Sequence, residues 1–149
     1  NVSDSSTGLQ KRKLSFSALG SQKELTIDSA EFLGDYKWNA SEIRAKLINN
    51  GYLLVEVAGK LTTDAPCFLV ATIERNGTME LIGKQPLLYV AFDQNRFFEK
   101  GSTNQWYCAF DLPKTLEPDA VIHFYCWNQG KQHIEIAPPV LYEVFTPTN

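Results

Sequence analysis

Several features that mark common functional classes are missing from this sequence. Its 149 residues include 14 Lys and Arg against 17 Asp and Glu, which gives a formal net charge of −3. Nucleic-acid-binding domains carry a basic surplus, so this class is excluded. No apolar run approaches the ~18 residues that a membrane-spanning helix needs. We therefore expect no membrane insertion by this segment.

Motifs of catalysis and metal binding are also missing. The chain has two histidines and no Gly-x-Ser-x-Gly sequence, so nothing indicates an activated nucleophile. The 17 acidic residues leave room for a glycosidase-type carboxylate pair, but no two of them are singled out. We expect no catalytic activity, no cofactor and no tightly bound metal.

Cysteine is scarce, and its spacing argues against a zinc site. Cys67, Cys108 and Cys126 are widely separated, odd in number and outside any Cys-x-x-Cys motif. Each alternates in phase with apolar neighbours, which favours three buried thiols that act as small hydrophobic side chains. A disulfide between Cys108 and Cys126 in an oxidising compartment stays open, because sequence does not give the distance between them.

Short alternating runs separated by turn signals make up most of the chain. We expect strands over residues 13–18, 24–28, 52–58, 67–74, 79–82, 87–92 and 105–112, and three more in the last thirty residues. Strands of this length at about ten-residue spacing predict an antiparallel sandwich or barrel. Residues 1–10 are polar and expected to fray, which leaves residues 11–149 as one domain.

Alternation also predicts the core and leaves one segment ambiguous. The side chains expected to face the core include Val55, Val57, Leu69, Phe110, Ile122, Phe124 and Cys126. Residues 41–48 fit either one helical turn or a strand. The alternation of Ile43, Ala45 and Leu47 favours the strand.

The last thirty residues suggest a hairpin around a turn at residues 128–130. With a three-residue loop, one face would carry the cross-strand pairs His123–Glu135, Tyr125–His133 and Trp127–Lys131. This face has three interpretations: a solvated sheet surface, a ligand-binding surface suited to sugars, or a metal site formed by His123, His133 and Glu135. The pairing fails if the chain crosses to another sheet after the turn.

A second candidate surface lies in residues 34–40, whose sequence is GDYKWNA. We interpret this segment as a polar loop that presents Tyr36 and Trp38, a combination suited to sugar stacking. The alternative is that Trp38 folds back and caps the sandwich. Arg96, in the polar loop expected over residues 93–104, is the candidate to lie beside such an aromatic platform.

Several short motifs resemble one known family. They are Tyr125-Cys126-Trp127-Asn128, Gly130-Lys131 and Leu141-Tyr142-Glu143-Val144, together with strand-like segments at residues 52–58, 68–76 and 106–113. Across about residues 10–145 the chain resembles galactose-binding-like jelly rolls, as found at the C-terminus of some bacterial membrane glycosyltransferases and surface proteins. The family usually has Asp-Asp, often a calcium ligand, where this chain has Ala137-Pro138-Pro139, so no calcium site is implied.

This resemblance implies an all-β, antiparallel two-sheet β-sandwich of the jelly-roll type in an extracytoplasmic location. It favours a non-catalytic module of a larger envelope or surface protein, with carbohydrate as the partner. The expected ligand-binding residues are Tyr36, Trp38, Arg96, Tyr125, Trp127 and His133. One alternative is an accessory β-sandwich without a small ligand. The other is a metal-dependent enzyme that uses His123, His133 and Glu135.

Overall fold

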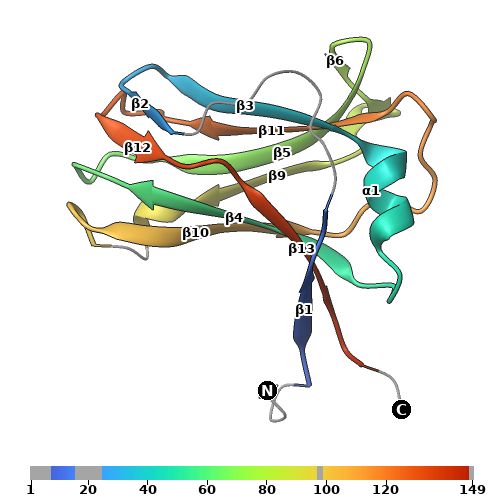
Figure 1. Ribbon diagram of the computed structural model, residues 1–149. Helices are drawn as coiled ribbons and strands as arrows, with labels where there is room; N and C mark the ends of the chain where they lie inside the picture. Colours follow the sequence, from blue (N-terminus) through green and yellow to red (C-terminus); the bar gives the residue numbers. More distant parts are fainter. Residues whose placement is uncertain (1–7, 16–24, 97–98, 148–149) are drawn as a thin grey trace.

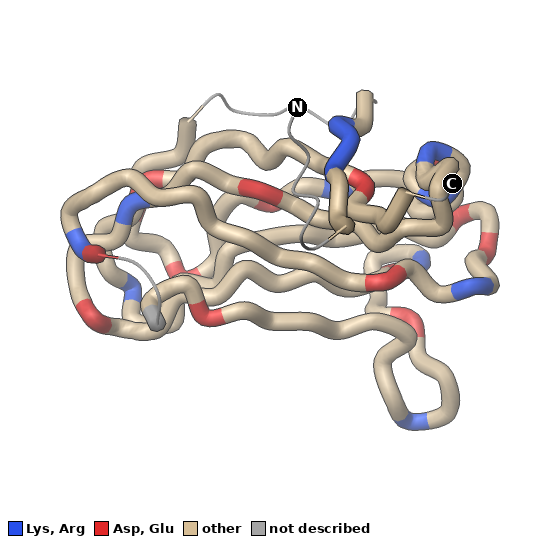
Figure 2. The backbone as a smooth tube through the Cα atoms, turned by 90° about the horizontal axis from the view of Figure 1, so that it is seen from below, with Lys and Arg blue, Asp and Glu red and all other residues tan. Residues whose placement is uncertain are grey.

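Two antiparallel β-sheets pack face to face in the computed structural model, which describes residues 8–15, 25–96 and 99–147 (Figure 1). The expected all-β class and two-sheet sandwich are confirmed, and the arrangement is jelly-roll-like. Charged residues of both signs are interspersed along the chain (Figure 2). Among the described residues, no helix combines the length and apolar character needed to cross a bilayer.

The first sheet is built around its longest strand, β4(Tyr52–Lys60). One edge of β4 pairs with β10(Thr103–Phe110). The other edge pairs with two strands in succession, β13(Val140–Phe145) and β12(Ile134–Ile136). The sheet is completed by β1(Gln10–Lys13), which pairs with β13, and by β2(Thr26–Asp28), which pairs with β12.

The second sheet carries the candidate site. Its strand order is β3(Phe32–Asn39), β11(Val121–Trp127), β5(Phe68–Arg75), with β6(Thr78–Met79) and β9(Tyr89–Asp93) both on the far edge of β5. A separate two-stranded hairpin, β7(Leu81–Ile82) and β8(Gln85–Pro86), follows β6 and projects from the sandwich (Figure 1).

The core lies between the sheets, as alternation predicts. All seven side chains expected there are buried, with exposed fractions of 0–6 %. Gly59 in β4 leaves room for the ring of Trp106. A Cβ at this glycine would lie 2.3 Å from Trp106 Cε2, so the close approach needs glycine. The three cysteines are buried free thiols, as expected.

The expected strand over residues 41–48 is wrong. The segment forms α1(Ala40–Lys46), which covers one end of the sandwich between β3 and β4 (Figure 1). Asn39 caps the helix, because its Oδ1 accepts the backbone N–H of Glu42 at 2.9 Å. Ala40 and Ile43 are fully buried on one helix face, and that helical spacing outweighs the local alternation.

The loop expected over residues 34–40 is also wrong. These residues belong to β3, apart from Ala40, which starts α1. Tyr36 and Trp38 alternate with Lys37 and point inward, with exposed fractions of 6 % and 2 %. The alternative in which Trp38 folds back onto the sandwich therefore describes its position better.

The expected hairpin between β11 and β12 does not form. The turn exists, since Lys131 N–H donates to Asn128 O at 3.0 Å, but the chain then crosses to the first sheet. There β12 pairs with β2 and β4. Both sheets face the same core. The buried side chains of Ile134 and Ile136 would therefore alternate in the same way whichever sheet β12 joined.

The N-terminal expectations are only partly covered by the described residues. Gln10 already belongs to β1, although residues 1–10 were expected to fray. Residues 1–7 lie outside the described residues, as do 16–18 of the strand expected over 13–18 and residue 24 of the strand expected over 24–28.

Candidate functional site

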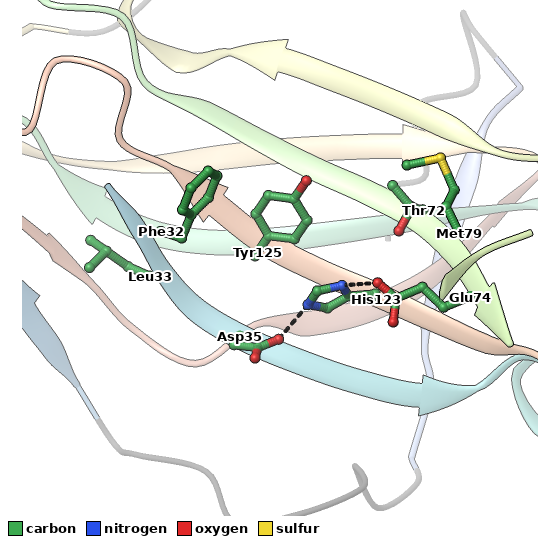
Figure 3. A pocket seen from close by; sticks show the side chains of 8 residues that line it. All are labelled: Phe32, Leu33, Asp35, Thr72, Glu74, Met79, His123 and Tyr125. Carbon is green, nitrogen blue, oxygen red and sulfur yellow. Dashed lines mark hydrogen bonds and ion pairs between the residues drawn. The ribbon is translucent and has the colours of Figure 1, made fainter. Parts of the chain in front are cut away.

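The outer surface of the second sheet, which faces away from the core, carries a pocket of about 250 Å³ (Figure 3). We call it the outer-face pocket. It is lined by Phe32, Leu33, Asp35, Thr72, Glu74, Met79, His123 and Tyr125. These residues come from β3, from β11, and from the consecutive strands β5 and β6, so strand pairing brings together three parts of the chain that are distant in sequence.

Register explains which side chains share this face. His123 of β11 lies directly opposite Thr72 of β5 and Lys37 of β3. Directly paired residues of antiparallel strands point to the same face, while their sequence neighbours point into the core. Ile122 and Phe124 are accordingly buried in the core on either side of His123.

A β-bulge in β3 aims Asp35 at this face. Leu33 pairs with Cys126 and Tyr36 with Phe124, so two residues, Gly34 and Asp35, stand opposite one residue of β11. Gly34 has φ +60°, the left-handed conformation found at the first position of this bulge type. A Cβ there would also lie 2.6 Å from Ile136 Cδ1, so glycine is required. The extra residue restores the inward direction of Tyr36 and turns Asp35 outward.

An ion-paired triad occupies one side of the pocket. His123 Nδ1 lies 2.6 Å from Glu74 Oε2, and Nε2 lies 2.5 Å from Asp35 Oδ1 (Figure 3). Lys37 Nζ lies 3.8 Å from the second oxygen of Glu74. A neutral imidazole has one N–H, so both ring nitrogens donate together only in the doubly protonated form.

Thr72 places an unpaired hydroxyl beside this triad. Its side chain is 1 % exposed, yet no described group forms a hydrogen bond with Oγ1. Figure 3 shows the Thr72 side chain to the right of the Tyr125 ring and above the Glu74 carboxylate. A buried hydroxyl without a partner is costly in a folded protein. Thr72 Oγ1 is therefore a buried polar atom beside the pocket that no described group satisfies.

Tyr125 begins an aromatic row that continues beyond the pocket. Its ring centroid lies 5.9 Å from that of Phe32, which is 59 % exposed. Trp127 lies 6.4 Å from Phe32 and 5.4 Å from Phe68, measured between ring centroids. Trp127 is further held by a hydrogen bond from Nε1 to Glu31 Oε2 at 3.2 Å. Partial burial raises the pKa of Tyr125, with smaller effects from Tyr89 and Glu74, so its hydroxyl stays protonated at neutral pH.

The structure does not bring all of the expected ligand-binding residues together in one site. Tyr125 lines the outer-face pocket, and Trp127 lies next to it in the aromatic row. Tyr36 and Trp38 lie in the core instead. His133 is exposed just before β12 of the other sheet, and Arg96 ends the short helix η1(Gln94–Arg96).

The His123, His133 and Glu135 set is separated by the crossing between sheets. Within the described part of the chain, no three histidine, cysteine or acidic residues are grouped so that they could hold a metal ion. His123 instead sits between Asp35 and Glu74, neither of which sequence analysis selected. The alternation of His123, Tyr125 and Trp127 did indicate their shared face, but their cross-strand neighbours depend on long-range register.

A second hollow lies elsewhere on the surface, near the end of α1. Its volume is about 460 Å³, and its lining includes Arg44, Asn50, Asp111 and Lys114 but no aromatic side chain. It therefore lacks the ring surface that distinguishes the outer-face pocket.

Comparison with known proteins adds no further assignment. No protein-family model matches the chain, and no curated protein sequence matches it. The case for function consequently rests on the geometry of the outer-face pocket.

Proposed function

We propose that this domain is a non-catalytic module that binds carbohydrate in the outer-face pocket. The observation that carries the proposal is the partly exposed ring of Tyr125 beside the unpaired Thr72 hydroxyl and two carboxylates. Sugars present an apolar C–H face and a ring of hydroxyls, and this combination of an aromatic surface with fixed polar groups suits both.

Each part of the pocket has a defined role in this proposal. The C–H face of a sugar ring stacks on Tyr125, with Phe32 as a side wall. Ligand hydroxyls donate to the free oxygen of Asp35, whose side chain is 68 % exposed, and form a hydrogen bond with Thr72. At about 250 Å³ the pocket is slightly smaller than most small-molecule sites, so it suits one sugar unit of a glycan.

Charge favours a neutral sugar. Asp35 and Glu74 contribute two carboxylates to the pocket, and Lys37 Nζ lies 3.8 Å from one oxygen of Glu74. An acidic sugar would meet two carboxylates at close range. A neutral sugar uses them as hydrogen-bond acceptors without bringing a new charge into the site.

The same contacts favour binding over catalysis. Both carboxylates are engaged with opposite nitrogens of one imidazole ring, and the lining contains no serine or cysteine nucleophile. The resemblance to galactose-binding-like jelly rolls supports a role within a larger extracytoplasmic envelope or surface protein. An accessory sandwich without a ligand is the alternative, and the Thr72 hydroxyl argues against it.

Binding to an array of neutral and acidic oligosaccharides tests the proposal. We expect binding to neutral glycans, and a loss of about tenfold or more in affinity for Tyr125→Ala because the stacking surface is removed. Tyr107→Ala is the matched control, since Tyr107 is a 45 % exposed tyrosine on the first sheet. Binding that is absent from the whole array, or insensitive to Tyr125→Ala, contradicts the proposal.

Thr72→Val provides a sharper test of the polar contact. The substitution keeps the shape of the side chain and removes only the unpaired hydroxyl. We expect weaker glycan binding with no loss of fold stability, because no described protein group loses a hydrogen-bond partner. Weaker binding accompanied by a comparable loss of stability would instead indicate a structural role for Thr72.

A further inference from the structure

Two of the three buried thiols lie in contact within the core. Cys67 immediately precedes β5, and Cys126 lies in β11, the strand paired with β5. Their Sγ atoms are 3.4 Å apart, although the residues are 59 positions apart in sequence. Both side chains are almost completely buried. Cys108 lies in β10 of the other sheet.

The surrounding backbone holds this pair in place. The carbonyl oxygen of Cys67 accepts the N–H of Gln94 at 2.8 Å, and Asn128, two residues after Cys126, donates its N–H to Glu31 O at 2.6 Å. A disulfide requires a sulfur–sulfur distance of about 2.05 Å, so the two atoms must approach by about 1.4 Å. In the register of β5 and β11, Cys126 pairs with Leu69, so Cys67 is its diagonal neighbour, two residues before the direct partner.

We propose that Cys67 and Cys126 form a disulfide when the chain folds in an oxidising compartment. In the reaction, one thiolate attacks a small-molecule disulfide such as oxidised glutathione, and one glutathione thiol leaves. The second protein thiolate then displaces the second glutathione. Two protein thiols are oxidised, one glutathione disulfide is reduced to two thiols, and the electrons balance.

Burial determines when this reaction takes place. The contact with Cys67, together with burial, raises the pKa of Cys126, and the thiolate is the form that attacks a disulfide. The folded protein therefore exchanges slowly, and the bond forms while the core is still open. Once formed, it fixes β11 to the start of β5 behind Tyr125 and Trp127. This inference is independent of carbohydrate binding.

Refolding from denaturant tests the cross-link. The reduced chain is refolded either in glutathione redox buffer or with excess reductant, and folded monomer is isolated, denatured and alkylated without reduction. Mass spectrometry is expected to show three alkyl groups on the reduced sample and one, on Cys108, after oxidative refolding. Peptide mapping is expected to find Cys67 joined to Cys126.

Variants in which one cysteine is replaced provide the controls. We expect Cys108→Ala to form the cross-link in the same buffer, and Cys67→Ala to form none. Three alkyl groups on wild-type folded monomer after oxidative refolding would overturn the proposal, as would a cross-link that involves Cys108. Because the wild-type result decides by itself, the test does not depend on the variants folding.

Discussion

Glu143 is fully buried, and we expect its replacement by glutamine to destabilise the fold by about 2–3 kcal/mol. The carboxylate accepts four hydrogen bonds. Oε1 receives Arg12 Nη2 at 2.9 Å and Asn49 Nδ2 at 3.1 Å, and Oε2 receives the backbone N–H groups of Asn49 at 2.9 Å and Gly51 at 2.8 Å. Together these bonds join β1, β13 and the turn before β4.

The magnitude follows from the donors that lose their acceptor. Glutamine keeps one oxygen, so its NH₂ group faces two former donors. Each buried donor left without a partner costs about 1–3 kcal/mol. The expected loss of stability lies in the lower part of the range for two donors, because the Arg12 side chain is 37 % exposed and can turn toward water.

The effect also has a defined pH dependence. Burial raises the pKa of Glu143, but the hydrogen bonds from Gly51, Arg12 and Asn49 outweigh it and bring the pKa below its ordinary value of 4.5. A depressed carboxyl pKa stabilises the fold above the unfolded-state value, and this contribution is lost as pH falls through the folded-state value. The difference between wild type and Glu143→Gln should therefore narrow below about pH 4.5.

Urea denaturation at pH 7 and at acidic pH measures both effects. Glu135→Gln is the control, because its ion pair with Lys60 spans 3.8 Å between side chains that are each more than one-third exposed. It should change stability by less than about 1 kcal/mol. A Glu143→Gln variant as stable as this control would mean that the four hydrogen bonds contribute little to stability. A stability difference that does not narrow in acid would mean that the Glu143 charge is not their source.

Two further predictions concern the core. Gly59→Ala should destabilise the fold by about 1–3 kcal/mol, because the new Cβ would overlap the Trp106 ring, and thermal unfolding should show a lower midpoint; an unchanged midpoint would mean that the ring shifts freely. Oxidation of Cys67 and Cys126 should stabilise the fold by up to about 4 kcal/mol, since it closes a loop of 59 residues in the unfolded chain. Equal urea midpoints for oxidised and reduced protein would contradict this estimate.

Strand alternation predicts the buried side chains of this protein well, because the core needs only that inward positions be apolar. It does not identify which sheet a strand joins. Ile134 and Ile136 face the same core from either sheet, and the crossing after residue 131 separates His133 and Glu135 from His123. Contacts between residues that are far apart in the sequence determine which sheet each strand joins.

The sequence also contains local signals for helix α1, which the alternation of apolar residues outweighed in the prediction. Asn39 followed three residues later by Glu42 is a helix-start pattern, and Ala40, Ile43 and Leu47 have helical spacing. The candidate site was harder to predict. Asp35 reaches His123 only because the bulge at Gly34 shifts the register of β3, and Thr72 and Glu74 join them through pairing with a strand nearly fifty residues away.

Mapping of amide chemical shifts shows whether the outer face of the second sheet binds a neutral glycan. ¹⁵N-labelled protein is titrated with the neutral oligosaccharide that binds most strongly on the array. We expect the shift changes to concentrate on Asp35, Thr72, Glu74, His123 and Tyr125, with little change at Glu56 or Tyr107 on the first sheet. Shift changes centred on the first sheet, or no shift changes at saturating oligosaccharide, would mean that this face does not bind the glycan.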